Sequence, residues 1–172
     1  VEAMKHAIEL AQESGISAVS VSNSSHNGAL SYFAHAAAEK DMIGIVMTHA
    51  TARVKTPGAK RAFFGNNPIC LVTPMQGEDP FCFDAATSSI TFNAVKAAAA
   101  VGKTLPAGLI ADANGYETTD PTKAQQLLPI GDYKGFGLSM MVDILCAVLS
   151  GMPNGNNVSR MFDDPLSKKR EL

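Results

Sequence analysis

Apolar residues along the first half of the chain change their spacing several times, as they do where helices and strands alternate. Met4, Ile8 and Ala11 recur at helical spacing, and Gly15 is suited to end that helix. Met42–Met47 is apolar almost without interruption, which is typical of a strand buried on both faces. The elements predicted in this half are a helix ending at Gly15, a strand over Ile16–Val21, a helix over Ala29–Lys40, a strand over Met42–Met47 and a polar loop without periodicity over Thr48–Arg61.

The second half predicts a strand pair, further helices and several turns. Thr87–Val101 is rich in alanine and is followed by Gly102, as expected for a helix that ends at a glycine. The other predicted elements are strands over Pro68–Thr73 and Phe81–Asp84 with a turn between them, a turn at 111–115, a short helix capped by Asp120-Pro121 and running through Gln125 and Leu127, a glycine-rich loop over Gly131–Gly137, and a buried helix over Leu138–Leu149. Interleaved helices and strands predict a mixed α/β fold.

Composition excludes several classes of protein. The 172 residues are enough for one domain or a large part of one, and the 46% apolar content supplies a core. The net charge of -2 comes from mixed acids and bases, with no basic stripe for nucleic acid and no polybasic patch for a membrane. Three cysteines form no CxxC pair, so we expect small buried thiols in a reducing compartment and no metal site.

Three positions carry residue types suited to catalysis or ligand binding. His26 lies among small polar residues and suits general acid–base catalysis, although a turn histidine bonded to backbone is the alternative. Asp84 ends a predicted strand, where ligands commonly bind, but an aspartate there is equally suited to cap a helix. Lys134 stands between glycines and could reach a phosphate, whereas an exposed loop lysine is the commoner case. No GxGxxG fingerprint and no Walker A loop accompany them.

Asp143 is an acid in the middle of the predicted buried helix. A buried carboxyl group needs a partner or it takes up a proton. We therefore expect a bond to backbone or to a loop hydroxyl, with a supporting role in catalysis as the alternative.

Taken together, the motifs give a resemblance that covers essentially the whole chain. The chain resembles the malate/L-lactate dehydrogenase family, which includes ureidoglycolate dehydrogenase, sulfolactate dehydrogenase and 2,3-diketogulonate reductase. The motifs that carry this resemblance are Ser25-His26-Asn27-Gly28-Ala29 with Tyr32-Phe33, Phe64-Gly65-Asn66-Asn67-Pro68, Phe83-Asp84-Ala85-Ala86-Thr87-Ser88, Asn114-Gly115-Tyr116-Glu117-Thr118-Thr119-Asp120-Pro121, Leu128-Pro129, Lys134-Gly135-Phe136-Gly137-Leu138 and Met161-Phe162-Asp163-Asp164.

The resemblance implies a nicotinamide-binding domain that is not a Rossmann fold, in agreement with the missing GxGxxG motif. It implies an NAD(P)-dependent oxidoreductase of small 2-hydroxy and 2-oxo acids such as malate, lactate or ureidoglycolate, with NAD as the expected cofactor and NADP as the alternative. Members are typically homodimeric and cytosolic, so we expect a cytoplasmic homodimer that binds a small-molecule substrate and neither nucleic acid nor membranes. The implied site residues are His26 as proton donor and acceptor, and Ala50, Asp84, Ala85, Ala86 and Lys134 at the cofactor.

Departures from the family pattern limit these expectations. The family usually begins with a helical domain that carries a Ser-His-Gly motif, which has no match here, and it has a C-terminal portion as well. We therefore expect residues 1–172 to be the cofactor-binding and catalytic core of a longer polypeptide. Several relatives carry glycine and a charged residue where this chain has Asn93-Ala94, and the loop over Ala50–Thr56 is more basic than usual. The competing hypothesis is a non-catalytic relative that keeps only the folded core.

Overall fold

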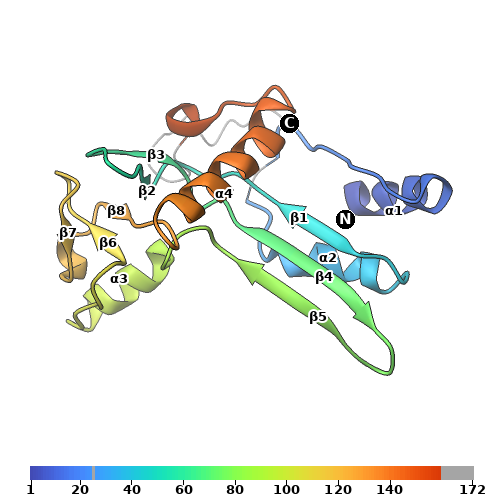
Figure 1. Ribbon diagram of the computed structural model, residues 1–172, viewed down its shortest axis with the longest axis horizontal. Helices are drawn as coiled ribbons and strands as arrows, with labels where there is room; N and C mark the ends of the chain where they lie inside the picture. Colours follow the sequence, from blue (N-terminus) through green and yellow to red (C-terminus); the bar gives the residue numbers. More distant parts are fainter. Residues whose placement is uncertain (25, 160–172) are drawn as a thin grey trace.

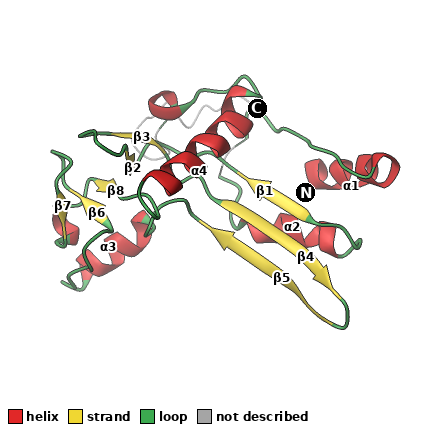
Figure 2. Cartoon of the chain, in the orientation of Figure 1, coloured by secondary structure: helices red, strands yellow, loops and turns green. Residues whose placement is uncertain are grey.

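Two β-sheets flanked by helices form the fold in the computed structural model (Figures 1 and 2). The model describes residues 1–24 and 26–159. One sheet has three strands in the order β1-β4-β5, and the other has five in the order β3-β2-β8-β6-β7. The elements are α1 (Glu2–Ser14), α2 (Leu30–Ala38), β1 (Gly44–Met47), β2 (Val54–Lys55), β3 (Ala62–Phe64), β4 (Ile69–Met75), β5 (Glu78–Ala85), α3 (Phe92–Ala100), β6 (Ile110–Ala111), β7 (Glu117–Thr118), the 3₁₀ turn η1 (Pro121–Lys123), β8 (Gln126–Leu127), α4 (Tyr133–Asp143), the π-helical turn η2 (Ile144–Val148) and the 3₁₀ turn η3 (Gly155–Asn157). This arrangement is the predicted mixed α/β fold.

The three-stranded sheet is antiparallel throughout, and α2 covers one of its faces. Leu30, Ala34 and Ala38 on α2 pack against Cys70 and Val72 of β4. Burial of a leucine side chain such as that of Leu30 contributes about 1.5–3 kcal/mol to stability. This contact holds the start of α2 over the end of β5, which positions the loop that precedes α2.

No described residue covers the opposite face of this sheet, contrary to the prediction that β1 is buried on both sides. Ile45, Leu71 and Phe83 lie side by side across the three strands, and Ile45 and Phe83 are each 53% exposed. A continuous apolar run is typical of a central strand with helices on both faces. Here β1 is an edge strand in an antiparallel sheet, and among the described elements α2 covers one of its faces.

Two further predictions in the first half are wrong. Ile16–Val21 forms no strand, and Ile16 is 82% exposed. A strand requires a neighbour that accepts and donates backbone hydrogen bonds, and none of the described strands lies beside this segment. Conversely, the expected loop over Thr48–Arg61 contains β2, which pairs with β3 in a hairpin and with β8 in parallel.

The helix predicted from Thr87 begins five residues later, at Phe92. Residues 87–90 instead run beside the Leu128–Ile130 segment, where the Ser89 N–H donates to the Leu128 carbonyl. Thr91 then caps α3 by accepting a hydrogen bond from the Ala94 N–H at 3.3 Å. These contacts hold the end of β5 away from helical geometry.

The C-terminal helix also differs from its prediction. It begins at Tyr133, inside the expected glycine-rich loop, and it is buried along one face only. Residues such as Met141 and Leu149 on the other face are exposed, because no described element packs against them. Within the described residues, no helix is long and apolar enough to cross a membrane.

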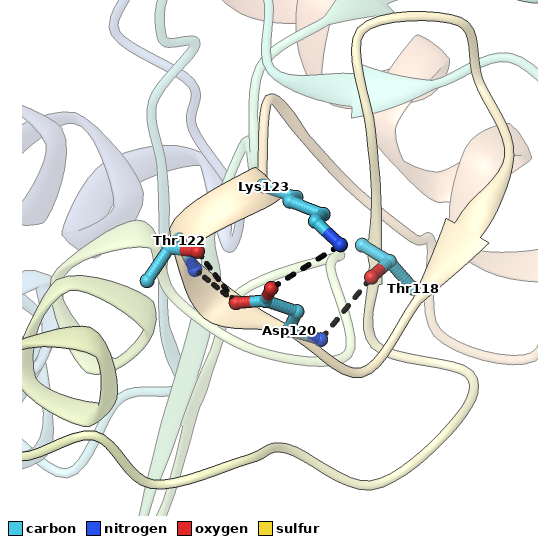
Figure 3. A network of polar contacts seen from close by, with 4 residues as sticks. All are labelled: Thr118, Asp120, Thr122 and Lys123. Atoms are coloured by element: carbon cyan, nitrogen blue, oxygen red, sulfur yellow. Dashed lines mark hydrogen bonds and ion pairs between the residues drawn. The ribbon is translucent and has the colours of Figure 1, made fainter.

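Asp120 begins η1 as the sequence predicts, although the helix is a single turn and Gln126–Leu127 belongs to β8. Its carboxylate accepts hydrogen bonds from the Thr122 N–H at 2.9 Å and from the Thr122 hydroxyl at 2.6 Å (Figure 3). The same carboxylate lies 3.5 Å from the Lys123 amine, and the Asp120 N–H donates to the Thr118 hydroxyl at 3.1 Å. These bonds, led by that from the Thr122 hydroxyl, lower the pKa of Asp120 below its usual value.

Replacing Asp120 with alanine is therefore expected to lower thermal stability in a pH-dependent way. The pKa of Asp120 is lower in the folded protein than in the unfolded chain. The stabilisation from its charged carboxylate is therefore complete when the pH is above the unfolded-state pKa, and it disappears as the pH falls through the folded-state pKa. Melting curves of wild type and Asp120→Ala should therefore converge in acid. Asp120→Asn keeps a capping oxygen without the charge, so residue 120 should add little pH dependence to the melting temperature of this variant. A difference in melting temperature between wild type and Asp120→Ala that stays constant down to strong acid would contradict this account.

Candidate functional site

A buried asparagine, Asn67, ties the Ala50 segment to α4. Its side chain is 0% exposed, accepts a hydrogen bond from the Ala50 N–H at 2.9 Å and donates one to the Ser139 carbonyl at 2.9 Å. The Ser139 hydroxyl in turn donates to the Gly65 carbonyl at 2.9 Å. A Cβ atom at Gly65 would overlap the Ala50 carbonyl oxygen and lie 2.6 Å from the Asn67 oxygen. The position of the Ala50 backbone is thus determined from both sides.

The end of β5 meets the first turn of α4 through backbone contacts. The Thr87 N–H and hydroxyl donate to the Asn66 carbonyl at 2.9 and 3.0 Å, and the Thr87 carbonyl accepts from the Ile130 N–H at 3.0 Å. Gly135 packs directly on these groups, since a Cβ atom there would overlap the Ile130 oxygen and lie 2.7 Å from the Thr87 oxygen. The turn that carries Lys134 is therefore adjacent to the residue that follows Ala86.

Lys134 lies in the first turn of α4 and is exposed. The prediction of a glycine-rich loop is wrong at this position, because Gly131 and Asp132, both with positive φ, turn the chain directly into the helix. The amino end of a helix attracts anions, and an ammonium group beside it adds to that attraction. A phosphate group fits this combination.

Asp84 does not cap the helix that follows it in sequence; it binds the amino end of α2, which precedes it by more than 50 residues. Its carboxylate accepts a hydrogen bond from the Ser31 N–H at 3.0 Å, in the first turn of α2. The favourable interaction of a carboxylate with a helix amino end holds this turn against β5. The loop containing His26 is thereby connected to the strand end that carries Asp84, Ala85 and Ala86.

The cysteines only partly match the expectation of buried thiols. Cys70 is buried, whereas Cys82 on the neighbouring strand is exposed and Cys146 is half-buried. Burial and then the Asp84 charge raise the pKa of the Cys70 thiol to about 12. Cys70 therefore stays protonated at neutral pH and packs as a small apolar side chain.

His26 is exposed and is bonded to the backbone of its own loop. The Gly28 N–H donates to the imidazole Nδ1 atom at 3.0 Å. In the neutral ring this leaves the proton on Nε2. Among the described residues, no hydrogen bond or ion pair joins His26 to the other predicted site residues. The preceding Ser25 and the Met161–Asp164 motif lie outside the described residues.

Asp143 is buried as predicted, with its carboxyl group 1% exposed. One oxygen accepts a hydrogen bond from the Gly155 N–H at 3.3 Å, so the expected bond to backbone is confirmed. Burial raises the pKa of Asp143, and this rise is opposed by the Gly155 N–H, by His49 and by the Asn67 side chain. Asn67 belongs to a motif that carries the family resemblance, but the sequence assigned it no role, and His49 was not singled out from the sequence.

Other surfaces offer weaker candidates for a site. A shallow apolar depression beside α3, lined by residues such as Ala94, Val101 and Leu105, contains none of the predicted site residues. Across residues 1–24 and 26–159, no three His, Cys, Asp or Glu side chains gather in a way that could hold a metal ion. The network around Asn67 is therefore the strongest candidate.

A family model described as malate/L-lactate dehydrogenase matches residues 1–172. The chain belongs to this family. It is 39% identical to ureidoglycolate dehydrogenase (NAD(+)) of Escherichia coli (strain K12), over 94% of this chain and 46% of that protein. It is 33% identical to (2R)-3-sulfolactate dehydrogenase (NADP(+)) of Chromohalobacter salexigens, over 93% of this chain and 49% of that protein.

Solved structures of the malate/L-lactate dehydrogenase family share the fold described above. The structure of delta1-piperideine-2-carboxylate reductase from Pseudomonas syringae pv. tomato matches with a TM-score of 0.89 and 34% identity, covering 95% of this chain and 50% of that one. The chain thus spans about half the length of the relatives it matches. The predicted fold class and family are both confirmed.

Proposed function

We propose that the full-length protein is an NAD(P)-dependent oxidoreductase that interconverts a small 2-hydroxy acid and its 2-oxo acid by hydride transfer. Residues 1–172 would form its cofactor-binding and catalytic core. One observation carries the proposal: the three segments that the family resemblance assigns to the cofactor are joined in one bonded network. That network links Ala50, the end of β5 and the first turn of α4 through Asn66, Asn67 and Ser139.

The residues present fit a dinucleotide. Lys134 supplies a positive charge at a helix amino end, which suits a phosphate. Ala50 offers only its backbone, and that backbone is held in place by Asn67. Ala85 and Ala86 are small, so they allow close approach at the strand end. When bound, a nicotinamide cofactor supplies the hydride chemistry that no protein side chain provides. NAD is the expected form and NADP the alternative.

His26 is the proposed general acid and base. Reduction of a 2-oxo acid leaves an alkoxide that needs a proton, and an imidazolium can deliver one from Nε2. In the reverse reaction the neutral ring accepts a proton at Nε2 and carries its own proton on Nδ1. In both directions Nδ1 is protonated during the transfer, so the Gly28 hydrogen bond to Nδ1 has to be exchanged for another.

Reduction of a cyclic imine is a second candidate for the reaction. It is favoured by the structural match to a delta1-piperideine-2-carboxylate reductase and by 38% identity to a related reductase of Pseudomonas putida. Carbonyl and imine carbons both accept hydride, so the core could serve either reaction. Steady-state assays of the full-length protein with 2-oxo acids and with cyclic imino acids would separate the two. Absence of turnover and of NAD(P)H binding would instead favour a non-catalytic relative.

Replacing Lys134 with alanine in the full-length protein should weaken NAD(P)H binding about 10–100-fold, because a charge-assisted contact contributes about 1.5–3 kcal/mol. Fluorescence titration measures the affinity, and the melting temperature should stay close to that of wild type because Lys134 is exposed. Lys40→Ala, at an exposed lysine just past α2, is the matched control. Unchanged affinity in Lys134→Ala would remove this residue from the site.

We also propose that the full-length protein is a cytoplasmic homodimer. Members of the family are typically homodimeric and cytosolic, and this expectation is carried over here. The exposed apolar face that contains Ile45 and Phe83 supports the view that more protein covers the described core.

A further inference from the structure

Two basic side chains meet at one aromatic ring at the start of α3. The Arg53 guanidinium carbon lies 4.3 Å from the centre of the Phe92 ring, and the Lys96 amine lies 5.7 Å from the same centre. Phe92 and Lys96 are one helical turn apart on α3, whereas Arg53 comes from the segment before β2. The ring packs against the core cluster that contains Val95, so it is a fixed platform for both cations.

Neither cation is neutralised by an acid of the described chain. Within residues 1–24 and 26–159, Arg53 and Lys96 form no ion pair. Two like charges at one ring repel each other, and an anion bound between them relieves that repulsion. Stacking uses the face of the guanidinium and leaves its N–H donors at the edge. Arg53 is half-buried and Lys96 is exposed, so a ligand can reach both groups.

The backbone of Arg53 is fixed by hydrogen bonds to two neighbouring segments. Its N–H donates to the Phe64 carbonyl at 2.8 Å, and its carbonyl accepts from the Leu127 N–H at 2.8 Å. The next residue, Val54, is 0% exposed and pairs with both β3 and β8. Only the side chain of Arg53 is left to move, and the Phe92 ring restricts it. A side chain held in this way loses less conformational freedom when it binds an anion.

The same hydrogen bonds place Arg53 next to the segments that the resemblance assigns to the cofactor. Arg53 follows Ala50 by three positions. Residues 127–130 separate Arg53 from the end of β5: Leu127 bonds to Arg53, and the Leu128 carbonyl accepts from the Ser89 N–H at 2.9 Å. The two cations at Phe92 therefore adjoin the network proposed to hold the dinucleotide.

We propose that Arg53, assisted by Lys96, binds the 2′-phosphate of NADP(H), so that the full-length protein prefers NADP(H) to NAD(H). This inference rests on the proposed function, and it selects the alternative cofactor over the expected one. A phosphate monoester carries a charge of about −1.5 to −2 at neutral pH, which two cations balance. The planar guanidinium can also donate two parallel hydrogen bonds to phosphate oxygens. A carboxylate carries a single charge and gives less reason for two cations.

The test is a fluorescence titration of NADPH and of NADH into the full-length protein at fixed ionic strength. Wild type should bind NADPH at least about tenfold more tightly than NADH, because a hydrogen bond to a charged group supports a difference of that size. Arg53→Met keeps an apolar stem on the Phe92 ring and removes the guanidinium. It should weaken NADPH binding about 10–100-fold and change NADH binding little.

Two further variants test the partner cation and the specificity of the effect. Lys96→Met should also weaken NADPH binding without changing NADH binding, but by a smaller factor, because the exposed amine lacks the planar fork of Arg53. Arg61→Met is the matched control, since Arg61 is an exposed arginine in the turn between β2 and β3. It should leave both affinities unchanged.

Several results would overturn the proposal, and they differ from failure of the proposed function. Equal binding of NADPH and NADH by wild type would refute it, as would an equal loss of both in Arg53→Met. If Arg53→Met keeps the ratio of the two affinities but raises KM for the 2-oxo acid, the bound anion is the substrate carboxylate. If only the melting temperature falls, Arg53 serves packing.

The proposal stays testable if Arg53→Met does not fold. Arg53→Lys keeps the charge without the planar fork, so an unchanged ratio of NADPH to NADH affinity in both Arg53→Lys and Lys96→Met refutes the inference. A wild-type protein that binds NADH more tightly than NADPH refutes this inference alone. A wild-type protein that binds neither dinucleotide refutes the proposed function together with it.

Discussion

Replacing His26 with asparagine in the full-length protein should lower kcat by about 10²–10⁴-fold, the usual contribution of a positioned acid–base group. Asparagine suits a turn and can still accept the Gly28 hydrogen bond, so the loop should keep its shape. Dinucleotide affinity should change far less than turnover, because the imidazole would face the reacting oxygen. The acidic limb of the pH–rate profile for hydroxy-acid oxidation should shift or vanish, since the base that must be unprotonated is gone.

Steady-state kinetics over pH provide the measurement, with His6→Asn as the control. His6 is an exposed histidine on α1, where it lies 3.7 Å from Glu9, and no site argument involves it. Its replacement should leave both kcat and the pH profile unchanged. Near-normal turnover and an unchanged profile in His26→Asn would mean that His26 is only a turn residue.

Replacing Gly135 with alanine should have the largest effect on the folded core. The added methyl group would overlap the Ile130 carbonyl and approach the Thr87 oxygen at 2.7 Å, and neither is a flexible side chain. Such overpacking typically costs about 1–3 kcal/mol of the free energy of unfolding. Because α4 must move away from the end of β5, the turn carrying Lys134 should move too, and dinucleotide affinity should fall with stability.

Gly137 offers a matched control two residues further along the same helix. A Cβ atom there meets nothing within 4 Å. Gly137→Ala should therefore stabilise the protein by about 0.5–1 kcal/mol through helix propensity alone. Chemical denaturation of both variants measures the difference, and equal stabilities would contradict the packing described around Gly135.

The elements that the sequence predicted well depend on residues close together in the chain. α1 ends at Gly15, α2 follows its apolar stripe, and the β4–β5 hairpin closes over a short turn. Asp120 caps the turn that follows it through bonds to Thr122. The spacing of apolar residues and the residues that cap helices are features of a few neighbouring positions, so they can be interpreted without knowledge of the fold.

The candidate site was predictable only in part, because its residues are connected by partners distant in sequence. Asp84 bonds to α2 rather than to α3, and Asn67 joins residues on either side of it that are 17 and 72 positions away. No local pattern identifies such partners. The family motifs indicated which segments matter, whereas the hydrogen bonds that join them required the tertiary structure.

The sequence by itself determined the mixed α/β class, the family and the segments that carry His26, Ala50, Asp84 and Lys134. Tertiary structure decided which faces are covered: β1 is apolar throughout, yet Ile45 is exposed because β1 lies at a sheet edge. It also decided that α4 starts at Tyr133 and that Gln126–Leu127 is a strand, since Gly135 packs on Thr87 and β8 pairs with β2 and β6. Local propensity differs by less than about 1 kcal/mol per residue between ordinary residues, and contacts with distant segments outweigh it.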